Sequence, residues 1–500
     1  MILNDMTPII ADSPAPSMTA RVVKAVMWRS GSQIVAQLSM WASTFWVLRL
    51  LDPSDYGLYA MTSGVMVLLS MLNGQGFAGA LIRAETITTA QVRQMFGLLL
   101  MMNGAIALLQ FAAAPLVAAY FRYPLVGTML RVQCLLYLAN PFIVLPGALL
   151  ARAMDFKRQA KVNLLAAAAG ALTALIGALS GLGVWTLVAA PLVAVWTRAI
   201  GMTIAARMLV WPSFGLAGAS GTVLFGGAML LSDLLWLVQT QADVAIGGRA
   251  LDTHRLGVYT TALFLAQIVT SKFIPPLNEV AFTAYAKLQH DRASAARAFE
   301  RSVGIIMLVA LPFYFGLAVT ASEFVATMLG PKWHDAIPVV AILAFAMPFL
   351  TLQILFAPAT TALGATRVQV WSAAAGAVLM PVGFIAGIQW GVLGLAWSWL
   401  IAMPLLTAFT AWIAMPVLGT SPRRLIEAIR PALLAAAGMA ATVALVDRLL
   451  PPSEPALRLA LLVSLGGVVY AGLAWLSAKR VVLETIAMFR QSRDGDVAAV

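Results

Sequence analysis

Long apolar stretches recur along this chain from residue 25 to residue 477, and they constrain its fold more than any other feature. About 20 apolar residues suffice for a helix to cross the hydrocarbon of a bilayer. Hydrophobic residues make up 61% of the sequence and charged residues only 10%, whereas ordinary soluble domains carry about 25% charged residues. Because backbone polar groups in lipid must bond to one another, the pattern predicts an all-α membrane protein with about fourteen transmembrane helices. The expected spans are 25–49, 57–80, 95–120, 125–150, 162–180, 184–206, 222–246, 257–280, 302–322, 336–361, 368–388, 391–415, 429–447 and 456–477.

Basic residues are divided unevenly between the two faces of this array. If the N-terminus is cytoplasmic, the segments on that face hold about three times as many Lys and Arg residues as those on the other face. Cytoplasmic loops of membrane proteins carry such an excess. We therefore expect a multi-pass protein of the bacterial inner membrane with both termini in the cytoplasm. The net charge of +12 is spread over many loops, which argues against a nucleic-acid partner.

Residues that could form a catalytic or metal centre are few and scattered. The single cysteine, Cys134, lies in an apolar segment, and the three histidines fall in three separate loops. The sequence shows no Cys/His cluster, no pattern of a hydrolase triad and no phosphate-binding glycine loop. We therefore expect no metal, no cofactor and no enzymatic activity.

One segment of the sequence is repeated at an offset of 200 residues. Residues 49–59 read RLLDPSDYGLY and residues 249–259 read RALDTHRLGVY, so that Arg, Leu, Asp, Gly and Tyr recur in order. Six spans separate the two copies, which gives both the same orientation in the membrane. Such a parallel repeat is related by an axis along the membrane normal. We expect Asp52 and Asp252 to be structural, with Asp52 capping the helix that begins at Pro53.

The repeat predicts two six-helix lobes related by a pseudo-two-fold axis, an arrangement that supports alternating access to a central site. The expected divisions are a cytoplasmic tail over 1–20, an N-terminal lobe over 21–210, a C-terminal lobe over 211–420, two further helices over 421–480 and a cytoplasmic tail over 481–500.

Two basic residues within the spans are candidates for substrate binding. An ionisable side chain at membrane depth is costly and usually faces a cavity or a partner. Lys272, in the eighth span, and Arg29, in the first, are predicted to line a cavity and to attract a diphosphate group. The alternatives are a lysine that snorkels to the interface and an arginine that only anchors its span at the cytoplasmic face.

The seventh span carries a second polar group of residues, Asp233, Gln239 and Asp243. Gln239 and Asp243 are four residues apart and share a helix face, and Asp233 can face the same groove. We predict either coupling to a driving ion, H⁺ or Na⁺, or a polar network within the lobe. The structural alternatives are a buried interhelical hydrogen bond for Asp233 and a pairing of Asp243 with Arg249.

Five stretches carry a resemblance to a known family. They are LLDPSDYGLYAM (50–61), GFAGALIRAETITTAQ (76–91), DVAIGGRALDTHRLGVYTTA (243–262), PLNEVAFTAYAKLQHDRASAARAFERS (276–302) and GPKWHDAIPVVAIL (330–343). Over roughly residues 20 to 420 the chain resembles the polysaccharide transporters of the multidrug/oligosaccharidyl-lipid/polysaccharide flippase superfamily, the O-antigen and exopolysaccharide flippases. It departs from the family pattern at residues 279–283, where an Arg followed by a Pro is usual.

The resemblance implies a MATE-like fold and a flippase that moves an undecaprenyl-diphosphate-linked oligosaccharide from the inner to the outer leaflet. It implies a monomer whose partners are this substrate, membrane lipids, and a polysaccharide polymerase and co-polymerase. The related lipid II flippases carry cavity arginines on the first, second and eighth spans, and only Arg29 and Lys272 match them here. The alternatives are a small-molecule or drug antiporter of the same superfamily and a membrane enzyme such as a sugar-chain ligase or polymerase. The short outer loops argue against the enzyme.

Overall fold

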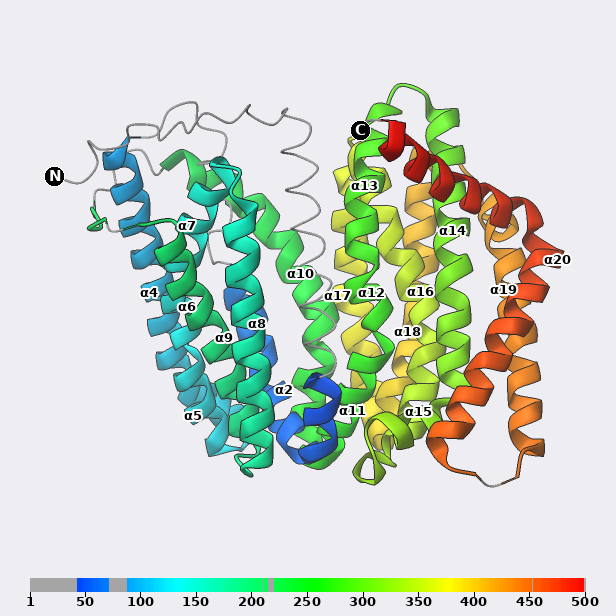
Figure 1. Cartoon of the computed structure of the whole chain (residues 1–500), viewed down its shortest axis with the longest axis horizontal. Helices are drawn as coiled ribbons and strands as arrows, with labels where there is room; N and C mark the ends of the chain where they lie inside the picture. Colours follow the sequence, from blue (N-terminus) through cyan, green and yellow to red (C-terminus); the bar gives the residue numbers. More distant parts are fainter. Residues whose placement is uncertain (1–42, 72–87, 209, 215–219, 452, 499–500) are drawn as a thin grey trace.

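The apolar spans fold as helices, and no strand occurs in the part of the chain that the computed structural model describes. That part comprises residues 43–71, 88–208, 210–214, 220–451 and 453–498, without the side chains of 220–233 and 478–498. Figure 1 shows two groups of helices side by side, with the last two helices along the far edge of the second group. The predicted all-α architecture of two lobes and two further helices is confirmed.

The first group is the N-terminal lobe, which contains a helix over 43–50 and the helices α2 to α9. The expected span 125–150 is divided into three helical segments, two of which begin at the prolines 124 and 141. Proline has no N–H to continue a helical ladder, so it suits the first turn of a new segment. The bounds are α2 (Pro53–Ser70), α4 (Thr89–Phe121), α5 (Pro124–Gln133), α6 (Leu135–Ala139), α7 (Pro141–Arg152), α8 (Phe156–Leu179) and α9 (Val184–Ala205).

The second group is the C-terminal lobe, which contains the helices α10 to α18 and two short 3₁₀ turns. Its second span is broken at two places, and a short helix that the sequence did not predict, α15, follows α14. The bounds are α10 (Ser220–Ala250), α11 (Thr253–Ala266), α12 (Ile268–Lys272), α13 (Ile274–Lys287), α14 (Arg292–Val319), α15 (Ala321–Met328), η1 (Pro331–Trp333), α16 (Ala336–Ala362), α17 (Thr366–Gly387), η2 (Ile388–Trp390) and α18 (Gly391–Leu418).

Two long helices follow the lobes, α19 (Pro422–Leu449) and α20 (Pro455–Ala498). They pack on each other and on α14. The helix α20 continues through residues that we expected to form a tail. Ten of the sixteen residues from 478 to 493 are Ala, Arg, Lys, Leu, Glu, Met or Gln, and these residue types favour helix.

A helix lies on the described part of each expected span; the first span is described only from residue 43 and the second only as far as residue 71. Among the described residues, nine segments are long and apolar enough to cross a membrane. These segments make the chain a multi-pass membrane protein, while the number fourteen stays a prediction.

The largest core lies in the C-terminal lobe around α16. This helix contacts α11, α13, α14 and α18, and most of its side chains are buried. In contrast, only 17% of the residues in the apolar windows of α8 and α9 are buried, as expected of helices that face lipid. The C-terminal lobe therefore provides the more rigid frame for polar groups within the membrane.

Candidate functional site

The two copies of the repeated segment meet where α2 crosses α11. A Cβ atom added at Gly57 would overlap the backbone of Thr253, and one added at Gly257 would overlap the backbone of Pro53. Each contact is the other shifted by 200 residues, so the contact is reciprocal, as a two-fold axis requires. Only glycine allows two helix backbones to approach this closely. We call the end of the molecule at which this crossing lies the repeat end; it is the lower end in Figure 1.

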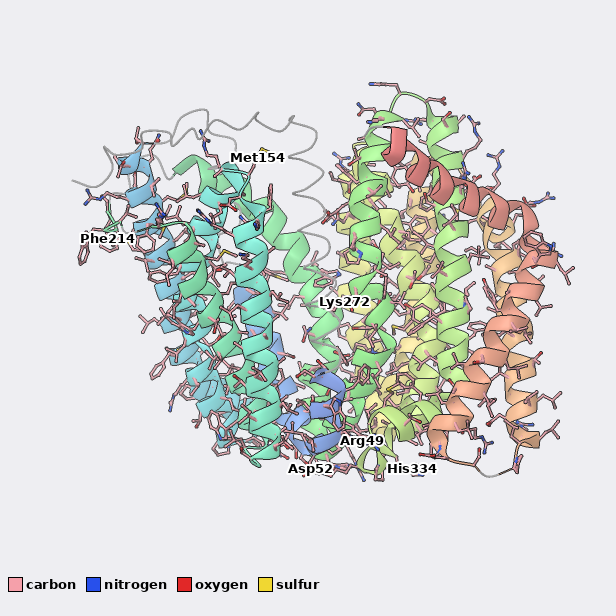
Figure 2. All side chains as sticks on the ribbon, in the orientation of Figure 1. Arg49, Asp52, Met154, Phe214, Lys272 and His334 are labelled. Atoms are coloured by element: carbon pink, nitrogen blue, oxygen red, sulfur yellow. The ribbon has the colours of Figure 1, made fainter. Side chains whose placement is uncertain are left out.

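Each copy of the repeat also contacts the opposite lobe. In the first copy, the indole N–H of Trp333 donates to the carbonyl of Leu48 at 2.8 Å, and Lys332 Nζ lies 3.1 Å from Asp52 Oδ1. Arg49, Asp52 and His334 are labelled together at the lower end of Figure 2. In the second copy, the guanidinium of Arg249 lies 6.0 Å from the centre of the Tyr120 ring, and the Tyr120 hydroxyl donates to the carbonyl of Ala245, four residues before this copy, at 3.2 Å. Contacts from both copies of the repeat therefore join the two lobes at the repeat end.

The aspartates of the repeat begin the helices α2 and α11, as predicted. Asp252 accepts a hydrogen bond from the backbone N–H of Arg255 at 2.8 Å. Asp52 precedes Pro53, its own N–H donates to Asp55 Oδ2 at 3.2 Å, and its carboxylate faces Lys332. Their structural interpretation is confirmed, and Asp52 adds a contact between the lobes that the sequence did not predict.

Lys272 lies at a bend of the helix that α11, α12 and α13 form together. The prolines 275 and 276 follow it, and since they have no N–H, the carbonyls of Ser271 and Lys272 have no helical donor four residues on. The side chain of Lys272 is exposed, near mid-height of the molecule (Figure 2). The bend thus presents a cation beside two carbonyl groups that lack their usual helical donors.

Asp243 is fully buried in the C-terminal lobe, where it joins three helices. It accepts a hydrogen bond from the hydroxyl of Tyr259 at 2.7 Å, and that hydroxyl accepts one from the indole N–H of Trp399, also at 2.7 Å. These residues come from α10, α11 and α18. The side-chain partner of Asp243 is therefore Tyr259, which is itself bonded to Trp399, and not Arg249, whose guanidinium lies over the ring of Tyr120.

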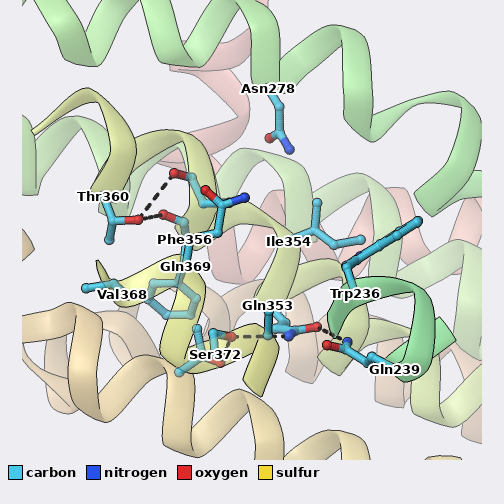
Figure 3. A pocket seen from close by; sticks show the side chains of 13 residues that line it. Trp236, Gln239, Asn278, Gln353, Ile354, Phe356, Thr360, Val368, Gln369 and Ser372 are labelled. Carbon is cyan, nitrogen blue, oxygen red and sulfur yellow. Dashed lines mark hydrogen bonds between the residues drawn. The ribbon is translucent and has the colours of Figure 1, made fainter. Parts of the chain in front are cut away.

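Gln239 begins a row of polar side chains that crosses the C-terminal lobe. Its amide donates to Gln353 Oε1 at 3.4 Å, Gln353 donates to the Ser372 hydroxyl at 3.4 Å, and Ser372 bonds to Thr410 at 2.6 Å. The row borders a cavity of about 340 Å³ between α10, α13, α16, α17 and α18 (Figure 3). Gln239 and Asp243 both face the interior of this lobe, in agreement with their spacing.

Two of the predicted site residues are not placed. Arg29 lies outside the described residues, and Asp233 lies in α10 at a position whose side chain is not described. The sequence analysis did not single out Gln353, Asn278 or Trp399. Gln353 and Asn278 could have been found as polar residues within apolar spans. Tyr259, the last residue of the second copy of the repeat, could have indicated the Asp243 network.

The fold defines the class of protein. Lipid II flippase MurJ, in an inward closed conformation, superposes with a TM-score of 0.74 at 12% identity, covering 91% of this chain and 99% of that chain. An inward-facing multidrug resistance MATE family transporter of the MOP superfamily superposes with a TM-score of 0.57 at 13% identity, covering 79% and 99%. The chain thus has the fold of the MOP-superfamily transporters.

The sequence defines the family within this class. Residues 47–338 match the polysaccharide biosynthesis protein family, and the chain belongs to it. The succinoglycan biosynthesis transport protein ExoT of Rhizobium meliloti (strain 1021) is 26% identical over 352 residues, which cover 70% of this chain and 71% of that protein. The lipopolysaccharide biosynthesis protein WzxC of Escherichia coli (strain K12) is 21% identical over 330 residues, which cover 65% and 67%. The resemblance to polysaccharide transporters, and the prediction of a transport protein instead of an enzyme, are confirmed.

Proposed function

We propose that this protein is a flippase that moves an undecaprenyl-diphosphate-linked oligosaccharide repeat unit across the bacterial inner membrane, for the synthesis of exopolysaccharide, capsule or O-antigen. The observation that carries this proposal is the family match over residues 47–338. The relatives are named for transport and biosynthesis of surface polysaccharides, and a lipid II flippase shares the fold. A diphosphate and a sugar chain cannot cross hydrocarbon unaided, since burying unpaired polar groups is too costly.

The mechanism that we propose is alternating access between an N-terminal lobe over 21–210 and a C-terminal lobe over 211–420. The reciprocal contact of Gly57 and Gly257 supports it, because a two-fold crossing at one end lets the lobes separate at the other. The helices over 421–480 lie outside this pair. The protein works as a monomer, and a polysaccharide polymerase and co-polymerase take the product.

The residue that we propose for the diphosphate is Lys272, with Arg29 as a second cation. An exposed lysine at mid-height of a membrane protein is costly unless it meets an anion or water. The carbonyls of Ser271 and Lys272, which lack their helical donors, favour a hydrated setting over a lipid-facing one. A diphosphate carries several acceptor oxygens that an ammonium group can bind.

Asp233, Gln239 and Asp243 then divide into two roles. Gln239 and Asp243 hold α10 against the rest of the C-terminal lobe through the contacts described above. Asp233, one turn and a half before Gln239 on the same helix, is the residue that we propose for coupling to H⁺ or Na⁺.

The orientation that we propose places both termini in the cytoplasm and the repeat end in the periplasm. The excess of Lys and Arg in the loops at the opposite end supports this orientation. The Gly57–Gly257 crossing then closes the periplasmic side.

Deletion of the gene, followed by complementation with variants, tests the proposal. Deletion in a strain without paralogues is expected to leave lipid-linked repeat units in the cytoplasmic leaflet and to abolish surface polysaccharide. Lys272→Ala is expected to fail to restore polymer at normal membrane level, whereas Lys272→Arg restores it in part. The matched control is Lys287→Ala, which removes an exposed lysine at the end of the same bent helix. Normal polymer in the deletion strain refutes the flippase, and full complementation by Lys272→Ala refutes the role of this lysine.

A further inference from the structure

The cavity of the C-terminal lobe has a lining of neutral polar groups. Its polar side chains are amides and hydroxyls, and none of its thirteen residues is Asp, Glu, Lys, Arg or His. The amides are Gln239 from α10, Asn278 from α13, Gln353 from α16 and Gln369 from α17. Without a carboxylate the cavity has no counter-ion for a cationic drug, and without a basic side chain it has none for an acidic ligand.

Two amide oxygens in this cavity lack a donor. Gln239 Oε1 and Asn278 Oδ1 are buried, and neither accepts a hydrogen bond from any residue that the structure describes. Gln239 is only 3% exposed and its Oε1 lies against Gly376 of α17, whereas Asn278 is half-buried, so the Asn278 amide is the one that a ligand in the cavity can reach. An unsatisfied buried polar atom destabilises a protein by about 1–3 kcal/mol, and a ligand that donates hydrogen bonds would remove that penalty.

Trp236 adds an apolar surface to this polar lining. It lies on α10 three residues before Gln239, and its side chain is 50% exposed. Figure 3 shows Asn278 at the top and Trp236 at the right of the group of lining residues, with Gln353 and Ser372 below Asn278. A flat indole face beside convergent amides and hydroxyls suits a ligand with both C–H and hydroxyl groups.

The volume and position of the cavity fit one or two sugar rings near the diphosphate site. About 340 Å³ lies within the range of small-molecule sites, about 300–1,000 Å³. Asn278 follows Lys272 by six residues along the bent helix, which corresponds to ~9 Å of helical rise. A sugar bonded directly to a diphosphate at Lys272 can therefore reach the amide of Asn278.

From this arrangement we propose that the cavity is a binding subsite for a neutral hexose of the lipid-linked oligosaccharide, the sugar next to the diphosphate. This inference rests on the proposed flippase function. The hydroxyls of the hexose donate to Asn278 Oδ1, Gln353 and Ser372 complete the hydrogen bonds, and Trp236 covers one face of the ring. A uronic acid at this place meets no cation and is disfavoured.

Binding of defined lipids to the purified full chain in lipid nanodiscs tests the subsite. The probes are undecaprenyl diphosphate alone and the same lipid carrying one glucose, one galactose or one glucuronate. We expect the glucose or the galactose lipid to bind about tenfold more tightly than the bare lipid, a gain of ~1.4 kcal/mol. The glucuronate lipid is expected to show no gain.

Variants of the lining separate the subsite from the diphosphate site. Gln353→Leu and Asn278→Leu are expected to abolish the gain without changing the affinity for the bare lipid. Gln369→Leu, at an exposed position of the lining, is expected to reduce it with little risk to folding. The matched control is Gln241→Leu, on the opposite face of α10, where Gln241 meets Ser63 of the other lobe; it is expected to keep the gain.

The outcomes distinguish the two proposals. Absence of a gain with both hexoses, or a gain that the lining variants leave intact, overturns the sugar subsite. Lys272→Ala is expected to weaken all four lipids by the same factor. If Lys272→Ala changes nothing while the lining variants abolish the gain, the diphosphate site is wrong and the sugar subsite stands.

Discussion

Gly57 and Gly257 occupy the same position in the two copies of the repeat, and they meet backbone to backbone where α2 crosses α11. The pairs are reciprocal, because Gly57 faces Thr253 while Gly257 faces Pro53. A pseudo-two-fold axis therefore passes between these two glycines. The sequence repeat and the contact between the lobes are thus two aspects of the same symmetry.

Alanine at either glycine is expected to disrupt this crossing. Gly57→Ala or Gly257→Ala forces the helices apart, and overpacking of this kind destabilises by about 1–3 kcal/mol. The melting temperature in detergent is expected to fall by a similar amount for both variants, and transport is expected to fall with it. The double variant is expected to destabilise by less than the sum, since both changes act on one contact.

Gly104→Ala is the control for these variants, because an added Cβ there would meet open space. It is expected to match the unmodified protein in stability and transport. A Gly57→Ala protein with full stability and activity would show that the crossing is not close-packed.

The hydrogen bonds of Asp243 predict a coupled loss of stability. Tyr259→Phe removes the hydroxyl that donates to Asp243, and Trp399→Phe removes the indole N–H that donates to Tyr259. Leaving a buried polar group unsatisfied costs about 1–3 kcal/mol, so each variant is expected to lower the melting temperature. A double-mutant cycle is expected to give a coupling energy of at least ~0.5 kcal/mol.

The comparison variant for this cycle is Tyr123→Phe, at a half-buried tyrosine of the N-terminal lobe. Its melting temperature is expected to be unchanged. Additive effects of Tyr259→Phe and Trp399→Phe would mean that the three side chains do not act as a network.

The proposed orientation predicts which loops a membrane-impermeant thiol reagent reaches in intact cells. The native Cys134 is buried, so it is expected to react little with the reagent, and labelling can be assigned to a single introduced cysteine. A cysteine at Ser453, in the exposed loop between α19 and α20, is expected to react from outside, and one at His290, in the exposed loop between α13 and α14, only after permeabilisation. The reverse pattern would overturn the orientation and place the repeat end in the cytoplasm.

The architecture was predictable because membrane physics leaves few choices. A long apolar span must be helical, and a parallel repeat with six spans per copy must form two similarly oriented lobes. The breaks at Gln267 and Phe273 were less predictable. The prolines 275 and 276 indicated a kink, but packing on α16 decides where the segments end.

The site was predictable only in part. Lys272 and Asp243 were evident because a charge in an apolar span is rare. Asn278 and Gln353 were not, because a neutral amide in a span does not reveal which helices it faces. The contact of Trp333 with Leu48 joins residues 285 positions apart, and nothing local in the sequence indicates such a pairing.

Translocation by the purified protein tests the central claim most directly. The measurement uses liposomes that contain undecaprenyl diphosphate linked to an oligosaccharide with a fluorophore on the sugar, and an impermeant quencher added outside. With the protein present, and with a proton or sodium gradient of either direction, we predict that the external quencher reaches the labelled lipid of both leaflets, because the inner-leaflet lipid is moved outward. Lys272→Ala is predicted to slow the quenching of the inner-leaflet label. Quenching that stops at the outer-leaflet label under every gradient, as in liposomes without protein, would contradict the account.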